Sequence, residues 1–312
     1  MKLISHQDIA NLNISPYQCY EWVSEIIKNK TEMILPAKIS LKPADGVFYN
    51  TMPAILPRYD IAGVKIVSRY PPRTPSLNSD ILLYRLSDGE ALCLINGNFI
   101  TAMRTGAVAA HSIQLLAKQD FSTIAIIGLG NVSGATVKVL LAIYPERKFT
   151  FKLFKYKNQH EIFARTFDKY DNAEFVICES KDEFIKGSDV VISGVTVFEE
   201  DFCDESLFEK GCLLVPLHTR GFSTCDLTFD KIFADDRAHV EGFRYFDKFK
   251  SFAEVTDVVA GKAPGRTSDD ERIIAYNIGI AIHDIFYAKK IFDMSPDCLE
   301  FQQNAETQKF WV

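Results

Sequence analysis

Lys65 stands in a position where a charged side chain is uncommon, and this suggests a role in ligand binding or catalysis. Alternation along the strand predicted over residues 62–69 places Lys65 on the same face as the apolar side chains of Ile61 and Val67. An ammonium group facing a pocket can hold a carboxylate or exchange a proton with an imine nitrogen. The alternative is an edge-strand lysine whose ammonium stays in water. The sequence supports these two interpretations about equally.

Arg104 is a second side chain with a suggestive position. The small and apolar residues 101–118 predict a helix, and Arg104 falls in its first turn. A cation there is disfavoured by the helix dipole unless an anion lies beside it. We therefore expect Arg104 to bind a carboxylate, which a guanidinium can hold through two parallel hydrogen bonds. The alternative is an ordinary solvated arginine.

A strand that runs into a glycine turn forms the centre of the chain. Apolar residues 124–127 end in Gly128-Leu129-Gly130, and a helix is predicted over residues 132–142. The first glycine permits a tight turn, the second lets backbone approach a pyrophosphate, and the helix N-terminus attracts phosphate. A plain glycine turn of an α/β protein is the alternative. The residues predicted here to contact a dinucleotide are Gly128, Gly130, Asn131, Val132 and Ser133.

After this turn, short apolar strands alternate with helices, which predicts a parallel, doubly wound sheet. Ligands of such sheets bind beyond the carboxyl ends of the strands, which adds Ser193-Gly194-Val195-Thr196 and the loop containing Arg220 to the predicted site. At the end of the second strand, Lys155-Tyr156-Lys157 stands where a carboxylate usually binds the adenosine ribose. The two lysines favour a 2′-phosphate. NADP is therefore slightly preferred over NAD as the expected cofactor.

The rest of the chain is predicted to be antiparallel β-structure at one end and a long helix at the other. A helix over residues 16–28 precedes strands over 38–41, 46–51, 62–69, 81–86 and 91–95. Near the C-terminus, Ser268 to Glu271 is a capping box that predicts a helix extending to about Phe292. Gly279 would interrupt it at a cost of about 1 kcal/mol, which indicates tight packing or a close ligand.

Composition narrows the functional classes. The 312 residues, 47% hydrophobic with net charge −6, suit a globular chain of about two domains. The chain has no block of basic residues that would indicate nucleic-acid binding. No apolar stretch approaches the roughly 20 residues that a membrane helix needs. Residues 1–13 lack a signal-peptide core, so we expect a cytoplasmic location. The seven cysteines fit buried thiols, and the histidine spacing gives no support for a metal site.

With these features assembled, the chain resembles the ornithine cyclodeaminase/mu-crystallin family over nearly its whole length. The resemblance rests on Met52-Pro53, Gly63-Val64-Lys65, residues 101–107, the glycine turn, and Gly261 to Arg266 followed by Asn277-Ile278-Gly279. It implies a Rossmann domain over residues 119–274. It also implies an N-terminal α/β domain over residues 1–118, completed by about 275–312, that binds substrate and forms a homodimer.

The resemblance also implies roles for individual residues. Lys65 and Arg104 match the family's substrate-binding lysine and carboxylate-binding arginine, and Lys38 stands where many members have a second arginine. Two positions depart from the cyclodeaminases: Asn50 and Arg220 replace acidic residues. An arginine cannot be a general base at neutral pH but suits a second substrate carboxylate. The expected substrate-binding residues are Lys38, Asn50, Met52, Lys65, Arg104 and Arg220, of which Lys65 and Arg104 are the catalytic candidates, and Gly279 joins the expected cofactor contacts.

The family contains cyclodeaminases, alanine dehydrogenases, ketimine reductases and enzymes that dehydrogenate amino-acid conjugates. The departures favour an NAD(P)-dependent oxidoreductase that moves hydride between nicotinamide and the Cα of an amino or imino acid. They also predict that L-ornithine is cyclised inefficiently. The alternatives are a deaminating cyclase that recycles bound NAD and a non-catalytic, crystallin-like binding protein.

Overall fold

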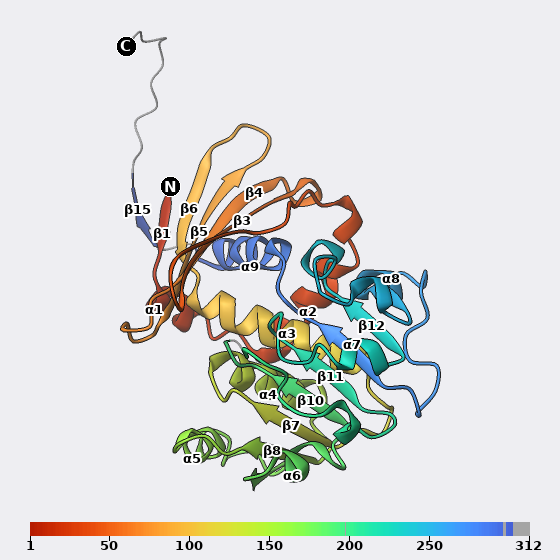
Figure 1. Ribbon diagram of the computed structural model, residues 1–312. Helices are drawn as coiled ribbons and strands as arrows, with labels where there is room; N and C mark the ends of the chain where they lie inside the picture. Colours follow the sequence, from red (N-terminus) through yellow and green to blue (C-terminus); the bar gives the residue numbers. More distant parts are fainter. Residues whose placement is uncertain (197, 296–297, 302–312) are drawn as a thin grey trace, which may run out of the picture. The chain divides into compact units, whose positions relative to one another are not determined.

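The computed structural model describes residues 1–196, 198–295 and 298–301 (Figure 1). Its contacts divide the chain into two compact units, one made of residues 1–14, 32–100 and 281–312 and the other of residues 15–31 and 101–280. The first unit contains a mixed, mostly antiparallel sheet and the second an all-parallel sheet of eight strands. The α/β fold class expected from the sequence is confirmed.

The first unit is a seven-stranded sheet in the order β15-β1-β6-β5-β4-β3-β2. All neighbours are antiparallel except β1 and β6. The five predicted strands are confirmed, whereas the short strands β1 and β15 were missed. The strands are β1 (Lys2–Ile4), β2 (Ile39–Ala44), β3 (Val47–Leu56), β4 (Ile61–Arg69), β5 (Leu77–Arg85), β6 (Ala91–Asn96) and β15 (Leu299–Glu300).

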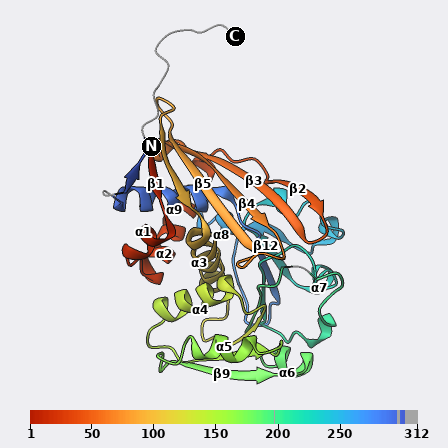
Figure 2. The ribbon, with the colours of Figure 1, turned by 90° about the vertical axis from the view of Figure 1, so that its left-hand side faces the viewer.

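One face of this sheet is covered by helix α9 (Ala281–Met294), which packs against β3, β4 and β5 (Figures 1 and 2). Gly63 on β4 makes this contact possible, because a Cβ there would lie 2.8 Å from Cδ1 of Ile285. Helix α1 (His6–Asn11) follows β1 and starts with a capping box at Ser5.

The second unit is built on the parallel sheet β13-β12-β14-β11-β10-β7-β8-β9. Its central strands are buried on both faces, which explains their continuous apolar sequences. The strands are β7 (Thr123–Ile127), β8 (Phe149–Phe154), β9 (Ala173–Cys178), β10 (Val190–Ser193), β11 (Leu213–Pro216), β12 (Lys231–Ala234), β13 (Phe252–Glu254) and β14 (Ile273–Tyr276).

Helices complete the second unit, and one of them, α2, begins where local signals indicate. Helix α2 starts after Ser15, which caps it, with Pro16 in the first turn, and it packs against α4. The helices are α2 (Pro16–Ile27), α3 (Asn98–Leu116), α4 (Asn131–Ile143), α5 (Gln159–Arg165), α6 (Lys181–Ile185), α7 (Cys225–Thr228) and α8 (Val255–Val259), with single 3₁₀ turns at Glu205–Leu207, Arg237–His239 and Phe246–Lys248. A further 3₁₀ turn, Pro57–Tyr59, belongs to the first unit, and another, Lys30–Glu32, contains the end of the second unit's segment 15–31.

The long helix expected from Ser268 to Phe292 is wrong. Residues 273–276 form strand β14, inserted between β11 and β12, and α9 begins only at Ala281. The β-branched Ile273 and Ile274 fit a fully buried strand better than a helix. Glu271 accepts hydrogen bonds from Thr267 and pairs with Lys231 at 2.8 Å, so it closes a turn instead of capping a helix.

Two smaller expectations, for the cysteines and for the domain boundaries, can be compared with the fold. All seven cysteines are free thiols and six are buried, as expected. Helices α2 and α3 belong largely to the second unit, whereas the sequence grouped them with the N-terminal domain; the predicted domain boundaries stay a prediction. Among the described residues, no helix is both long and apolar enough to cross a membrane, and no three potential ligand side chains gather into a metal site.

Candidate functional site

The glycine turn after β7 fits the phosphates of a dinucleotide. Gly128 has a φ of +83°, and a Cβ on it would lie 2.5 Å from the backbone of Gly194, so only glycine can occupy this position. By contrast, a Cβ on Gly130 would meet no atom within 4 Å, which leaves open space where α4 begins. The Ser133 hydroxyl donates a 2.6 Å hydrogen bond to the carbonyl of Gly128 and fixes the turn. The first helical N–H groups lack intrahelical partners and can bind anions.

The predicted loop after β10 lies directly against this turn. β10 pairs with β7, so that Ser193 is opposite Ile127, and the Gly194 N–H donates to the Ile127 carbonyl at 2.8 Å. The Ser193 hydroxyl is hydrogen bonded to Nε2 of His218 at 2.6 Å, and both side chains are buried. Burial lowers the pKa of His218 to about 4, so its ring is neutral at neutral pH. The chain continues through half-buried Val195 to exposed Thr196.

The predicted cofactor residues at the end of β8 are exposed. Lys155, Tyr156 and Lys157 follow the strand, and the Lys155 ammonium pairs with Oε1 of Glu179 at 2.6 Å. The hydrogen bond from Lys155 lowers the pKa of the Glu179 carboxyl. One of the two lysines expected to bind a 2′-phosphate therefore already has a carboxylate partner.

Lys65 is fully buried and forms an ion pair with Asp284. Its Nζ lies 2.7 Å from Oδ1 of Asp284 on α9, and both side chains have 0% exposure. Strand β4 lies inside the sheet, between β3 and β5, so the edge-strand interpretation of Lys65 is wrong. Sequence reasoning missed Asp284, because it lies 219 positions further along the chain. A buried ion pair is costly to form, which makes Lys65 a candidate for function.

Three other predicted substrate residues lie near Lys65 in the first unit. Met52 on β3 is opposite Lys65 in the ladder, so the two side chains share a face. Asn50 is on the same face of β3 two residues earlier, opposite Val67. Its Oδ1 is buried without a hydrogen-bond partner in the part of the chain that the structure describes. Half-buried Lys38 immediately precedes β2.

Arg104 is buried in the second unit and held against a glycine. Helix α3 begins at Asn98, so Arg104 lies in its second turn and the expectation of a first-turn cation is wrong. The helix extends three residues further back than its small-residue pattern indicates. Gly279 has a φ of +99°, and a Cβ there would lie 2.5 Å from Nη1 of Arg104. The predicted close approach at Gly279 is thus a contact with Arg104.

The backbone at Gly279 is itself fixed by a carboxylate that the sequence did not single out. The Gly279 N–H donates a hydrogen bond to Oδ2 of Asp235, whose other oxygen lies 3.3 Å from Nδ1 of His239. Burial by itself would raise the pKa of Asp235, but the hydrogen bonds from His239 and Gly279 hold it below its ordinary value. This negative charge stabilises the chain segment that contacts Arg104.

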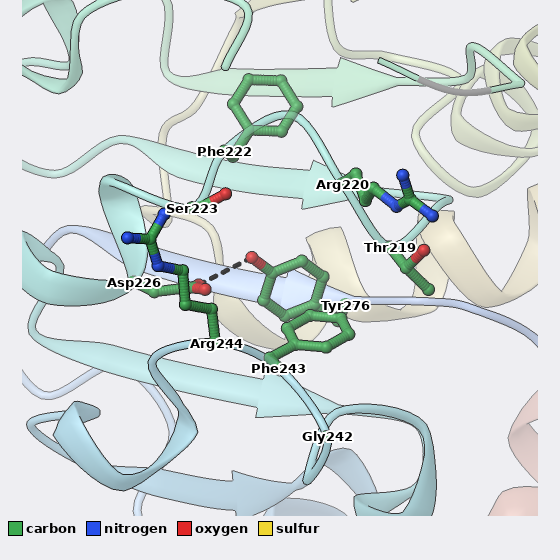
Figure 3. A pocket seen from close by; sticks show the side chains of 9 residues that line it. All are labelled: Thr219, Arg220, Phe222, Ser223, Asp226, Gly242, Phe243, Arg244 and Tyr276. Carbon is green, nitrogen blue, oxygen red and sulfur yellow. Dashed lines mark hydrogen bonds between the residues drawn. The ribbon is translucent and has the colours of Figure 1, made fainter. Parts of the chain in front are cut away.

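Arg220 follows β11 and is exposed. It lines a cavity of about 300 Å³ together with Asp226, Arg244 and Tyr276 (Figure 3). The sequence analysis did not identify Arg244, because no motif or periodic pattern surrounds this single arginine in an irregular segment. The cavity lies wholly within the second unit, at the carboxyl ends of β11 and β14.

The family model for "Ornithine cyclodeaminase/mu-crystallin family" matches residues 3–297. The chain belongs to this family. Nodulation efficiency protein NfeD of Rhizobium meliloti is 26% identical over 95% of each chain. A Delta(1)-pyrroline-2-carboxylate reductase of Bacillus cereus is 23% identical over 94% of this chain and 96% of the relative. The structure of Thermococcus litoralis Delta(1)-pyrroline-2-carboxylate reductase with NADH and L-proline superposes with a TM-score of 0.83, at 24% identity, over 94% of this chain and 97% of that one.

Distant members of the ornithine cyclodeaminase/mu-crystallin family therefore include imino acid reductases, and a solved relative binds NADH. The features that carried the resemblance have distinct physical tasks in this chain. Gly63 lets α9 approach β4, Gly128 lets the loop after β10 approach the turn, and Gly279 makes room for Arg104.

The buried ion pair gives a prediction about stability. We expect Asp284→Asn to lower the free energy of unfolding by about 3–5 kcal/mol, because it leaves the buried ammonium of Lys65 without its counter-charge. Asp293→Asn is the matched control on the same helix, since it removes a half-exposed partner of Lys289 and should cost under about 0.5 kcal/mol. Urea unfolding of the three proteins measures both. If both variants changed the free energy of unfolding by the same small amount, Asp284 would not be what stabilises the buried charge of Lys65.

Proposed function

We propose that this protein is an NAD(P)-dependent oxidoreductase that acts on the CH–N bond of an amino or imino acid. The observation that carries the proposal is the ammonium of Lys65, fully buried and paired with Asp284, in a chain that also has the glycine turn expected of a dinucleotide site. The family membership supports the same reaction class. The departures at Asn50 and Arg220 from the cyclodeaminase pattern favour a reductase or dehydrogenase over a cyclase.

The nucleotide phosphates would be held by the turn at Gly128 and Gly130, the first turn of α4, and the loop Ser193–Thr196. A bound nicotinamide supplies or accepts a hydride. Lys65 places a positive charge and a proton donor at the imine nitrogen, and Asp284 fixes the direction of its ammonium. The buried Oδ1 of Asn50 can accept a hydrogen bond from the same nitrogen once that nitrogen is protonated. Lys38 and Met52 are the remaining side chains of the first unit that we assign to substrate binding.

Arg104 is the group that we assign to the substrate α-carboxylate. Its guanidinium is buried, and contact with Gly279 restricts its orientation. A guanidinium fixed in this way loses little freedom when a carboxylate binds through two hydrogen bonds. Arg104 thereby orients the substrate and need not exchange protons.

We infer that the first unit also carries a homodimer contact. The sheet face opposite α9 is apolar and half-exposed, and it includes a shallow hollow of about 320 Å³ lined by Pro53, Ile55, Val64 and Tyr84. A monomer that exposes such a face is prone to associate. Light scattering of the purified protein should give twice the 35.3 kDa mass of one chain, and a value of one chain would exclude this contact.

Net use of cofactor tests the reaction class. We expect stoichiometric oxidation of added NADH or NADPH with cyclic ketimine acids or with 2-oxo acids plus ammonia. L-Ornithine with oxidised cofactor should yield little proline or ammonia. Rapid proline formation without net cofactor change would instead identify a deaminating cyclase. Ligand binding with no turnover of either kind would support a crystallin-like binding protein.

The form of the cofactor is a separate prediction. Lys155 and Lys157 favour a 2′-phosphate, whereas the ion pair of Lys155 with Glu179 competes for one of these charges. We expect a small preference for NADPH that falls in the Lys157→Ala variant. Lys169→Ala, which removes an exposed lysine elsewhere in the unit, should leave both dissociation constants unchanged. Tighter binding of NADH by the unaltered protein would reject the preference.

Substitution of the two central residues tests the site. Arg104→Ala should lower kcat/KM by roughly one to two orders of magnitude, because loss of charge-assisted hydrogen bonds costs about 1.5–3 kcal/mol. Cofactor affinity should change little. Lys65→Met should lower kcat further, and Lys65→Arg should restore charge without the original geometry. Arg165→Ala, an exposed arginine on α5, is the control. Normal turnover by folded Lys65→Met would place the active site elsewhere.

A further inference from the structure

We propose that the cavity beside β11 and β14 binds a second acidic group of the substrate, with Arg220 and Arg244 as its cations. The substrate class is then an amino or imino acid that carries another carboxylate. This inference rests on the proposed function, which it makes more specific. It adds Arg244, Asp226 and Tyr276 to the site.

The cavity lies at the carboxyl ends of the parallel strands, on the same side of the sheet as the glycine turn. Ile127, the last residue of β7, is in register with Ser193 on β10, which is in register with Pro216 on β11. Tyr276 ends the next strand, β14, and the following N–H, of Asn277, donates to Pro216. The cavity therefore opens at the same edge as the glycine turn, three strand spacings or about 14 Å away. This is the edge where doubly wound sheets bind their ligands.

Arg104, the group assigned to the α-carboxylate, lies within reach of this cavity. Gly279, which contacts the Arg104 guanidinium, is only three residues after Tyr276. Three residues of extended chain span at most about 11 Å. The Cα atoms of Tyr276 and Gly279 are therefore at most about 11 Å apart, and we infer that one dicarboxylic substrate bridges Arg104 and the cavity.

The charges in the cavity suit an anion. Arg220 and Arg244 are exposed, and the guanidinium of neither forms an ion pair or hydrogen bond with any residue that the structure describes. Figure 3 shows them on either side of the Tyr276 ring. The Arg244 guanidinium lies 5.0 Å over the ring of Tyr245, which restrains its side chain. Two guanidinium groups at one cavity provide the planar donors that a carboxylate prefers.

Among the described residues that line the cavity, Asp226 is the one acid, and its environment makes it compatible with an anion. It is buried and accepts a 2.7 Å hydrogen bond from the Tyr276 hydroxyl (Figure 3). Burial raises the pKa of Asp226 to about 7, although the hydrogen bond from Tyr276 works in the opposite direction. A substantial fraction of this carboxyl is therefore neutral at pH 7 and can donate to a bound carboxylate. The ring of Phe243 offers apolar contact to the methylene groups between the two acids.

Matched substrates test the acidic subsite. We would measure oxidation of L-glutamate and its isosteric amide L-glutamine, and of L-aspartate and L-asparagine, with saturating oxidised cofactor. We expect kcat/KM for the better acid to exceed that for its amide by about tenfold or more. Arg244→Gln should reduce this ratio by about tenfold, toward one, mainly through a higher KM for the acid. Arg237→Gln, an exposed arginine outside the cavity, should leave the ratio unchanged. A ratio near one, or an equal loss for acid and amide in Arg244→Gln, would overturn the proposal.

Binding separates failure of the subsite from failure of the proposed reaction. If none of these amino acids is oxidised, calorimetry with glutarate and butyrate in the presence of NAD replaces the kinetic assay. Tighter binding of glutarate that is lost in both Arg220→Gln and Arg244→Gln would support the subsite even though the oxidoreductase proposal had failed. Equal binding of glutarate and butyrate, or no binding of either, would reject the acidic subsite.

Discussion

Two opposite charges, those of Lys65 and Asp284, lie in contact inside the first unit with no exposure to water. Burying each ion costs several kcal/mol, and apolar replacements of such pairs are often neutral or stabilising. The pair is therefore poorly explained by stability alone. It is well explained if the ammonium must remain charged and directed at one point, and the approach of α9 to β4 at Gly63 serves that purpose.

Close backbone approach at a glycine shapes both the glycine turn and the surroundings of Arg104. At Gly128 the absence of a side chain lets the loop after β10 lie on the glycine turn, and at Gly279 it makes room for the Arg104 guanidinium. Asp235 then holds the Gly279 backbone through a hydrogen bond. In each case a glycine and a nearby polar group set the geometry, so that few other residue types are tolerated there.

The sequence predicted those features whose signals are local. The glycine turn, the alternating strands and the capped helix α2 are specified by neighbouring residues, and each was confirmed. Strand β14 was mistaken for helix because a genuine capping-box pattern precedes buried apolar residues, and periodicity does not separate the two over a short stretch. The partner of Lys65 and the cavity around Arg244 depend on contacts between distant segments, which no local pattern records.

The central claim is that the protein transfers a hydride between nicotinamide and the Cα of an amino or imino acid. The most direct measurement uses reduced cofactor that carries deuterium at both positions of nicotinamide C4, with a cyclic ketimine acid or a 2-oxo acid plus ammonia as the acceptor. Mass spectrometry and NMR of the amino acid product should find one deuterium at Cα for each cofactor oxidised. An unlabelled product, or a product formed without net oxidation of the cofactor, would contradict this account.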